Sequence, residues 1–210
     1  MTRVGILGGT FDPIHVGHLV LAAEVRDAAR LDRVLFIPTA TPPHKPTSTG
    51  SSARDRLEMV RRATASEPAF EVSDLEIRRG GVSYTIDTVE ALQAERPEVA
   101  WEFLAGADCL HDLPDWHRAE ELLARIPFRI ASRAGFDVEG ALAVVRERLG
   151  EATADDLASR IVGIPSIGVS SSDLRRRVAE GRTIRYLVPR PVEAYVRQRG
   201  LYRRGERANP

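Results

Sequence analysis

Two histidines, His15 and His18, stand three positions apart in the stretch GILGGTFDPIHVGH, residues 5–18. The stretch leaves an apolar run, turns on Gly8 and Gly9, and then reaches the position where a helix should begin. Side chains three apart share one side of a helix, and the first helical turn carries free N–H donors and the positive end of the dipole. We therefore expect both imidazoles and the backbone N–H groups to direct donors toward one anion, while the glycines leave room for a phosphate.

Other interpretations of this stretch remain to be weighed. A strand, a glycine turn and two histidines at a helix start could have a purely structural role. The residue types alone do not decide between that role and ligand binding. A Rossmann dinucleotide site is disfavoured because GILGGT does not contain the spacing G-x-G-x-x-G. A zinc site lacks a third ligand at a recognisable spacing, and Cys109 and His111 make no metal site either. No metal site built from protein ligands is therefore expected.

A second group of hydroxyls and cations lies in SSSDLR, near the end of the chain. Ser170 and Asp173 have the spacing of a helix capping box, and Ser171 and Ser172 add hydroxyls that can serve a phosphate. Arg175 is expected in the first turn, where a cation is unfavourable unless an anion sits there. An ordinary helix cap would account for Ser170 and explains less of Arg175, so this helix start is a second candidate phosphate site.

Four more residues have side chains suited to a nucleotide. The stretch GGVSYTIDT leaves backbone donors and Thr85 before a helix, where they can meet a carboxylate. Trp116 offers a flat face to a cationic pyridine ring, although a tryptophan is more often packed in a core. Lys45 has a long stem that could close over phosphates, and a solvated surface lysine fits the sequence equally well. Asp108 follows a predicted strand, where a parallel sheet binds its ligand.

The elements that must position these residues follow from hydrophobic periodicity. Short apolar runs predict buried strands at 3–7, 33–38, 70–74, 101–106, 128–132 and 160–165. Segments of helical period between and after them lie at 18–31, 53–65, 84–95, 115–126, 138–150 and 171–181. This alternation predicts an α/β protein with a doubly wound, mostly parallel sheet and helices on both faces. The irregular segment 38–52, rich in Pro, Thr and Ser, is expected to be a mobile loop over the site.

Composition limits the class of protein. A chain of 210 residues with 43% hydrophobic content can close one core, so a single domain is expected over 1–200, with a C-terminal helical part at 170–200 and a flexible basic tail at 201–210. Lys and Arg balance Asp and Glu at 30 each, which favours neither nucleic acid nor an anionic membrane. A single cysteine and the absence of a leader-like segment or a membrane-length apolar run predict a cytoplasmic protein.

The motifs now permit a comparison with known families. GGTFDPIHVGH resembles the signature of nucleotidyltransferases with T/HxGH motifs, and its FDPIH form is similar to bacterial nicotinate-nucleotide adenylyltransferases. Further segments agree in the same order, namely PTATPPHKP, RLEMV, SYTIDTV, FLAGADCLHDLPDWHR, ASR and VSSSDLRRRV. The chain departs in one detail, because the family usually has threonine where this chain has Ser172. Either hydroxyl can serve a phosphate, so the expected role is unchanged.

The resemblance implies a Rossmann-like fold, an activity and a set of site residues. Enzymes of this family make nicotinate adenine dinucleotide and pyrophosphate from ATP and nicotinate mononucleotide, with Mg²⁺. It implies that His15, His18 and Arg175 are catalytic. It implies ATP binding by Gly8, Gly9, Thr10, Phe11, His15, His18, Gly106, Asp108, Ser171, Ser172 and Arg175, and substrate binding by Lys45, Thr85, Trp116 and Arg133. Thr85 and Trp116 would recognise the nicotinate ring, Arg133 would lie at the nucleotide phosphates, and a homodimer is expected.

The expected chemistry needs no general base. A phosphate monoester has its second pKa near ~6, so at neutral pH the mononucleotide is already a dianionic nucleophile. The rival substrates are phosphopantetheine, which lacks an aromatic cation to stack on Trp116, and nicotinamide mononucleotide, which these motifs separate poorly from nicotinate. A non-catalytic nucleotide sensor is a rival of another class, although such a protein could lose His15, His18 or Arg175 and this chain has all three.

Overall fold

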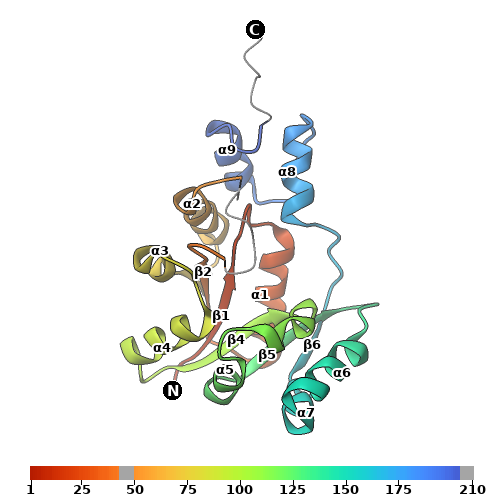
Figure 1. Ribbon diagram of the computed structural model, residues 1–210. Helices are drawn as coiled ribbons and strands as arrows, with labels where there is room; N and C mark the ends of the chain where they lie inside the picture. The colour runs from red at the N-terminus through yellow and green to blue at the C-terminus, as the bar shows by residue number, and fades with distance from the viewer. Residues whose placement is uncertain (43–49, 204–210) are drawn as a thin grey trace.

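The sheet has the predicted doubly wound architecture. The computed structural model describes residues 1–42 and 50–203, and within them six parallel strands lie in the order β3-β2-β1-β4-β5-β6 (Figure 1). The strands are β1 (Arg3–Gly9), β2 (Arg33–Pro38), β3 (Phe70–Val72), β4 (Ala100–Gly106), β5 (Phe128–Arg133) and β6 (Ile161–Ile164). All six predicted strands are present, which confirms the fold class.

The helices follow the predicted segments with two kinds of departure. They are α1 (Val16–Ala29), α2 (Ala53–Thr64), α3 (Leu75–Arg79), α4 (Thr85–Glu95), α5 (Ala119–Arg125), α6 (Val138–Leu149), α7 (Glu151–Ser159), α8 (Ser171–Ala179) and α9 (Arg190–Gln198), with short 3₁₀ turns η1 (Ala107–His111) and η2 (Leu113–Asp115). The helix expected over 115–126 begins only at Ala119, because Arg118 has a left-handed backbone with φ of 55°. The periodicity missed α3, which is five residues long, and α7, which follows α6 after Gly150 alone. It also missed α9, which lies within the C-terminal helical part expected at 170–200.

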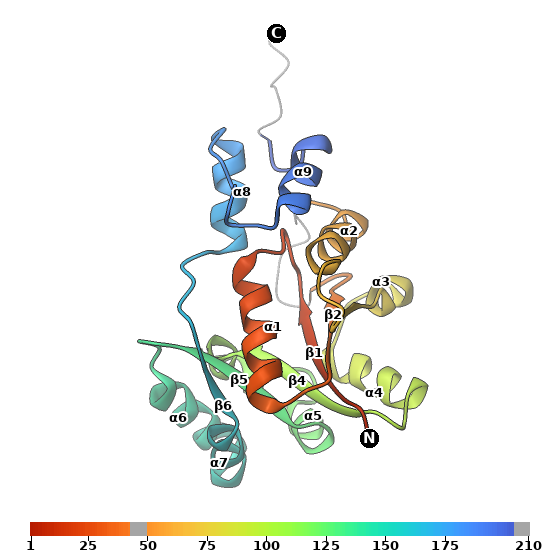
Figure 2. The same cartoon turned by 180° about the vertical axis from the view of Figure 1, so that it is seen from behind.

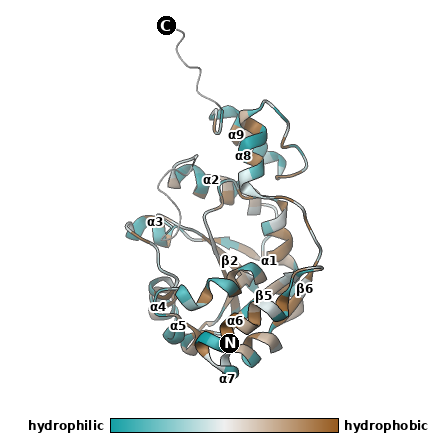
Figure 3. Ribbon diagram, turned by 45° about the vertical axis from the view of Figure 1, so that its right-hand side comes forward, coloured by the Kyte–Doolittle hydropathy of each residue, from teal (hydrophilic) through white to brown (hydrophobic). Residues whose placement is uncertain are grey.

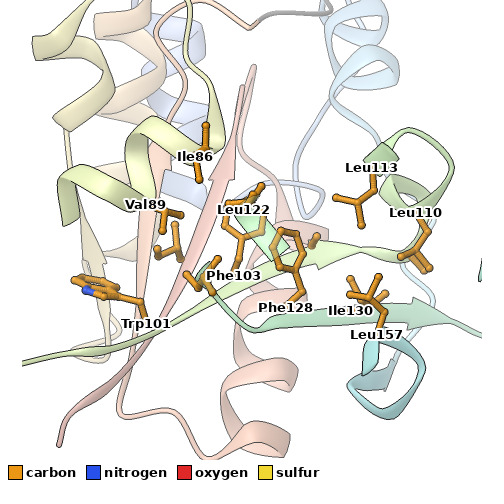
Figure 4. Packing of buried hydrophobic residues seen from close by; sticks show 14 of the residues in the cluster. Ile86, Val89, Trp101, Phe103, Leu110, Leu113, Leu122, Phe128, Ile130 and Leu157 are labelled. Atoms are coloured by element: carbon orange, nitrogen blue, oxygen red, sulfur yellow. The ribbon is translucent and has the colours of Figure 1, made fainter. Parts of the chain in front are cut away.

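Alternation along each strand builds a core on both faces of the sheet. In β2, Leu35 and Ile37 face one cluster of buried residues, whereas Val34 and Phe36 face the other. Helices α4, α5, α6 and α7 cover the first face, whose packing Figure 4 shows. Helices α1, α2, α8 and α9 cover the second face, where α1 packs over β5 and β6 and lies in front of the sheet in Figure 2. Several of these helices carry both teal and brown segments in Figure 3, as amphipathic elements between core and solvent do.

A gap between two central strands positions the site. The ladder between β1 and β4 ends at the pair Ile6 and Phe103. Beyond that pair, β1 continues along β2 to Gly9, and β4 continues along β5 to Gly106. The carboxyl ends of β1 and β4 therefore part at the point where the strand order reverses, which is where sheets of this type bind ligands.

The C-terminal part lies beyond this gap. Figures 1 and 2 place α8 and α9 past the carboxyl end of β1. Leu201 and Tyr202 were expected in a flexible tail, and the structure contradicts that expectation because both side chains pack against the second core cluster. Residues 43–49, which include Lys45 and the middle of the loop predicted over 38–52, and residues 204–210 lie outside the described residues. No helix in the described part of the chain is long and apolar enough to cross a membrane.

Two adjacent leucines of α5 test the packing. Leu122 is fully buried, whereas its neighbour Leu123 is only partly buried. We expect Leu122→Ala to lower the free energy of unfolding by about 2–5 kcal/mol, because a buried leucine leaves a cavity when truncated. Leu123→Ala is the matched control and should cost clearly less. Urea denaturation of the three proteins measures the difference, and equal losses for both variants would contradict this core.

Candidate active site

Two adjoining pockets open at the gap between β1 and β4. The larger has a volume of about 880 Å³ and the smaller about 270 Å³. Both are lined by Gly8, Gly9 and Thr10 at the end of β1 and by Phe103 and Trp116 on the other side. The pockets therefore share a wall at the turn that the sequence singled out.

The larger pocket brings together every residue expected to bind ATP. Its lining includes Gly8, Gly9, Thr10, Phe11, His15, His18, Gly106, Asp108, Ser171, Ser172 and Arg175. The beginnings of α1 and α8, more than 150 positions apart in sequence, thus converge on one cavity. Arg133 also lines this pocket and is not among the residues lining the smaller one, where Thr85 lies.

The two histidine rings are stacked at the start of α1. Their ring centroids lie 3.7 Å apart with an angle of 23° between the planes, which places both side chains on the same side of the helix. The His15 backbone N–H donates to Nδ1 of His18 at 3.2 Å. This backbone donor is therefore not directed at an anion, contrary to expectation. Because Nδ1 of His18 accepts, the proton of a neutral His18 ring is on Nε2, which makes Nε2 the donor.

His15 stays uncharged because it is buried. His15 is only 7% exposed. This burial lowers the pKa of its imidazole from the ordinary 6.5 to about 4. Gly17 makes room for this ring, since a Cβ at that position would lie 3.1 Å from Cε1 and Nδ1 of His15. A side chain at this position would crowd the His15 ring, so the glycine of the motif favours the observed position of that histidine.

The start of α8 is tied to the first loop. The Ser171 hydroxyl donates to the carbonyl of Pro13 at 2.9 Å, and Ser170 caps the helix by accepting from the Asp173 N–H at 3.2 Å. Arg175 was expected in the first turn of α8. It is the fifth residue of that helix and so lies just past the first turn. The anion beside it is Asp12, whose carboxylate lies 3.8 Å from Nη1 of Arg175.

The smaller pocket has aromatic walls and a helix start. Trp116 meets Phe103 edge to face at 5.9 Å between centroids, so the predicted pocket residue also packs against the core. Tyr84 is the N-cap residue of α4, and its side chain makes no capping hydrogen bond. Thr85, the first residue of α4, lines this pocket, so the positive end of the helix dipole lies at the pocket wall.

One buried cation that the sequence interpretation missed holds the loops around both pockets. Arg56 in α2 is 1% exposed. Its guanidinium donates to the carbonyls of Thr10 at 2.9 Å, Thr39 at 2.6 Å and Ala40 at 3.0 Å. The segments after β1 and β2 are thereby fixed to each other. RLEMV contains this arginine, but nothing in the spacing of that motif shows that a guanidinium folds inward.

A buried carboxyl was missed in the same way. Glu76 in α3 lines the smaller pocket and accepts from the Thr88 hydroxyl at 2.8 Å. Burial raises the pKa of the Glu76 carboxyl above its ordinary value. The hydroxyls of Thr88 and Ser83 favour the charged form and oppose this rise only in part. Glu76 thereby ties α3 to the first turn of α4, and Arg79 donates to the same Thr88 hydroxyl at 3.1 Å.

Comparison with known proteins shows the family of this chain. The family model described as cytidylyltransferase-like matches residues 6–177. A protein of Symbiobacterium thermophilum is 45% identical over 206 residues, covering 98% of each chain, and one of Synechococcus is 44% identical over 95% of this chain and 94% of the relative. Each bears the name "Probable nicotinate-nucleotide adenylyltransferase". The chain belongs to this nicotinate-nucleotide adenylyltransferase family.

Solved structures support the fold of the family at lower identity. The nicotinic acid mononucleotide adenylyltransferase of Plasmodium falciparum, solved with NaAD, matches with a TM-score of 0.76 at 18% identity, covering 96% of this chain and 98% of that one. A structure described as a putative nicotinate-nucleotide adenylyltransferase from Vibrio parahaemolyticus matches with a TM-score of 0.66 at 20% identity, covering 97% and 96%. Identities this low bear on the fold alone.

The low pKa of His15 predicts how stability depends on pH. Between pH 6.5 and 4 the unfolded chain protonates this histidine and the folded chain does not, so the free energy of unfolding falls as pH is lowered through that window. The full contribution is on the order of 3 kcal/mol. We expect His15→Gln to flatten this fall, as measured by urea denaturation at several pH values. An unchanged pH slope in the variant would contradict a buried neutral His15.

Proposed function

We propose that the chain transfers the adenylyl group of ATP to nicotinate mononucleotide, giving nicotinate adenine dinucleotide and pyrophosphate. The observation that carries the proposal is the larger pocket, in which the beginnings of α1 and α8 present His18 and Arg175 to one space. The adjoining smaller pocket, with Trp116 and the uncapped start of α4, suits a pyridine ring that carries a carboxylate. Family membership supports the same reaction.

The reaction is a displacement at phosphorus. The 5′-phosphate of nicotinate mononucleotide attacks the α-phosphorus of ATP, a new P–O bond forms, and the bond to pyrophosphate breaks. Because the attacking phosphate is already deprotonated at neutral pH, no residue has to remove a proton. The site must bring two polyanions together in line and stabilise the developing charge, which donors and cations accomplish. His18 would donate to the reacting phosphates through Nε2, and Arg175 with Ser172 would hold the β and γ groups.

Mg²⁺ fits this site as a companion of ATP. No cluster of three His, Cys, Asp or Glu side chains able to hold a metal occurs in residues 1–42 and 50–203. Magnesium is commonly bound by one or two carboxylates together with substrate phosphates, and Asp108 in the larger pocket is suited to that role. When bound, the ion would neutralise charge on the triphosphate.

The acid form of the pyridine substrate is the one this pocket favours. The start of α4 supplies N–H donors and a positive dipole end, both of which suit a carboxylate. The Glu76 carboxyl also lines this pocket, and its buried Oε2 has no hydrogen-bond partner among the described residues, so it could accept from an amide. The preference for the acid form rests on the N–H donors and the dipole at the start of α4. We therefore propose that nicotinate mononucleotide is preferred over the nicotinamide form.

A substrate panel tests the proposal. Purified protein receives ATP and Mg²⁺ with nicotinate mononucleotide, nicotinamide mononucleotide or phosphopantetheine, and pyrophosphate release is measured. We expect the highest kcat/KM with nicotinate mononucleotide, by roughly tenfold or more over the nicotinamide form, because a charged group in the substrate is matched by fixed donors. Release of pyrophosphate with none of the three would favour a non-catalytic nucleotide sensor.

Two further expectations are proposals as well. Self-association as a homodimer rests on the family resemblance. A cytoplasmic location rests on the single cysteine among the 210 residues, which suits a reducing compartment.

His18 offers the most direct test of catalysis. We expect His18→Ala to lower kcat by about 10²–10³-fold with both substrates saturating, because a preorganised donor to the developing charge is lost. The matched control is His111→Ala, since His111 is exposed and is not among the lining residues of either pocket. Melting curves should show that both variants fold. Near-normal turnover of His18→Ala would defeat the assignment.

A further inference from the structure

Asp12 is the meeting point of three distant parts of the chain. This residue is 2% exposed and follows the glycine turn. The hydroxyl of Tyr202 donates to its Oδ1 at 2.6 Å, the Ser51 hydroxyl donates to the same oxygen, and the Gly50 N–H donates to Oδ2 at 3.0 Å. Neutral donors from the segment before α2 and from the end of the chain thus surround a buried carboxylate.

Arg175 approaches the same aspartate without forming a close ion pair. Its Nη1 donates to the main-chain carbonyl of Asp12 at 2.7 Å and lies 3.8 Å from the carboxylate oxygen. The Arg175 side chain is 37% exposed and lines the larger pocket. Because neutral donors already satisfy the carboxylate, the guanidinium can stay turned toward the pocket.

The missing side chain of Gly50 makes this arrangement possible. A Cβ at Gly50 would lie 2.8 Å from Cδ1 of Tyr202 and 3.2 Å from Cδ of Arg175. The phenol ring and the arginine stem therefore pack against the same glycine. Any side chain there would push on both groups that bind Asp12.

We propose that Tyr202 is a positioning residue for Arg175: by holding the Asp12 carboxylate it keeps the guanidinium available to the triphosphate. The proposal rests on the proposed function. Tyr202 follows α9 and lies outside residues 6–177, which the family model matches. Without its hydroxyl, the buried carboxylate loses a donor and draws Arg175 into a close ion pair, away from the pocket, because a buried charge needs compensation.

The phenol is suited to act as a constant donor. Burial, with the charge of Asp12 beside it, raises the pKa of Tyr202 above the ordinary value for tyrosine. The hydroxyl therefore keeps its proton throughout the pH range in which the enzyme would work.

The first experiment compares two tyrosines from the same end of the chain. Tyr195 in α9 donates to the Asp55 carboxylate at 2.8 Å, away from both pockets, so Tyr195→Phe is the matched control for Tyr202→Phe. We expect Tyr202→Phe to raise KM for ATP and lower kcat/KM for ATP about tenfold, the size of one hydrogen bond to a charged group, with KM for nicotinate mononucleotide unchanged. Tyr195→Phe should leave all three constants near wild type, with melting temperatures measured for both variants.

A double-mutant cycle separates positioning of Arg175 from a purely structural role. If Tyr202 acts through Arg175, then Tyr202→Phe should have little further effect on kcat/KM for ATP in an Arg175→Ala background. Effects that multiply independently, or a Tyr202→Phe variant as active as Tyr195→Phe, would overturn the inference. A wild-type protein that releases no pyrophosphate would instead refute the proposed function, and this inference with it.

Discussion

The end of the ladder between β1 and β4 is the constraint on which the site depends. Backbone pairing stops at Ile6 and Phe103, and each strand then follows its other neighbour. Gly8 and Gly9 line the space that opens, and they carry no side chains to fill it. Both pockets and the two helix starts that face the larger one follow from this divergence.

Buried charges hold the loops around that space. Arg56 joins the segments after β1 and β2, Glu76 fixes the first turns of α4, and Asp12 joins the first loop to the end of the chain. Through these contacts they fix main-chain carbonyls, the Thr88 hydroxyl and the Arg175 guanidinium around the pockets. A site that works by positioning two polyanions needs such rigid support, because small displacements of donors weaken charge stabilisation strongly.

The sequence predicts the fold and the larger pocket well because both follow from local patterns. Apolar runs mark every strand, and the glycine turn with two histidines marks one helix start. The roles of Arg56 and Asp12 could not be predicted in this way. The hydrogen-bond partners of both residues are distant in sequence; Asp12 and Tyr202, for example, are 190 positions apart. Only the folded chain shows that the charges of Arg56 and Asp12 are buried. Tyr202 stands in a basic C-terminal stretch, and the composition of that stretch does not indicate its contact with Asp12.

The most direct test of the account is a crystal structure of the protein with a non-hydrolysable ATP analogue. The account predicts that the triphosphate lies in the larger pocket between the beginnings of α1 and α8, with Nε2 of His18 and the guanidinium of Arg175 in hydrogen-bond contact with phosphate oxygens. A triphosphate bound elsewhere, or one that touches neither side chain, would contradict it.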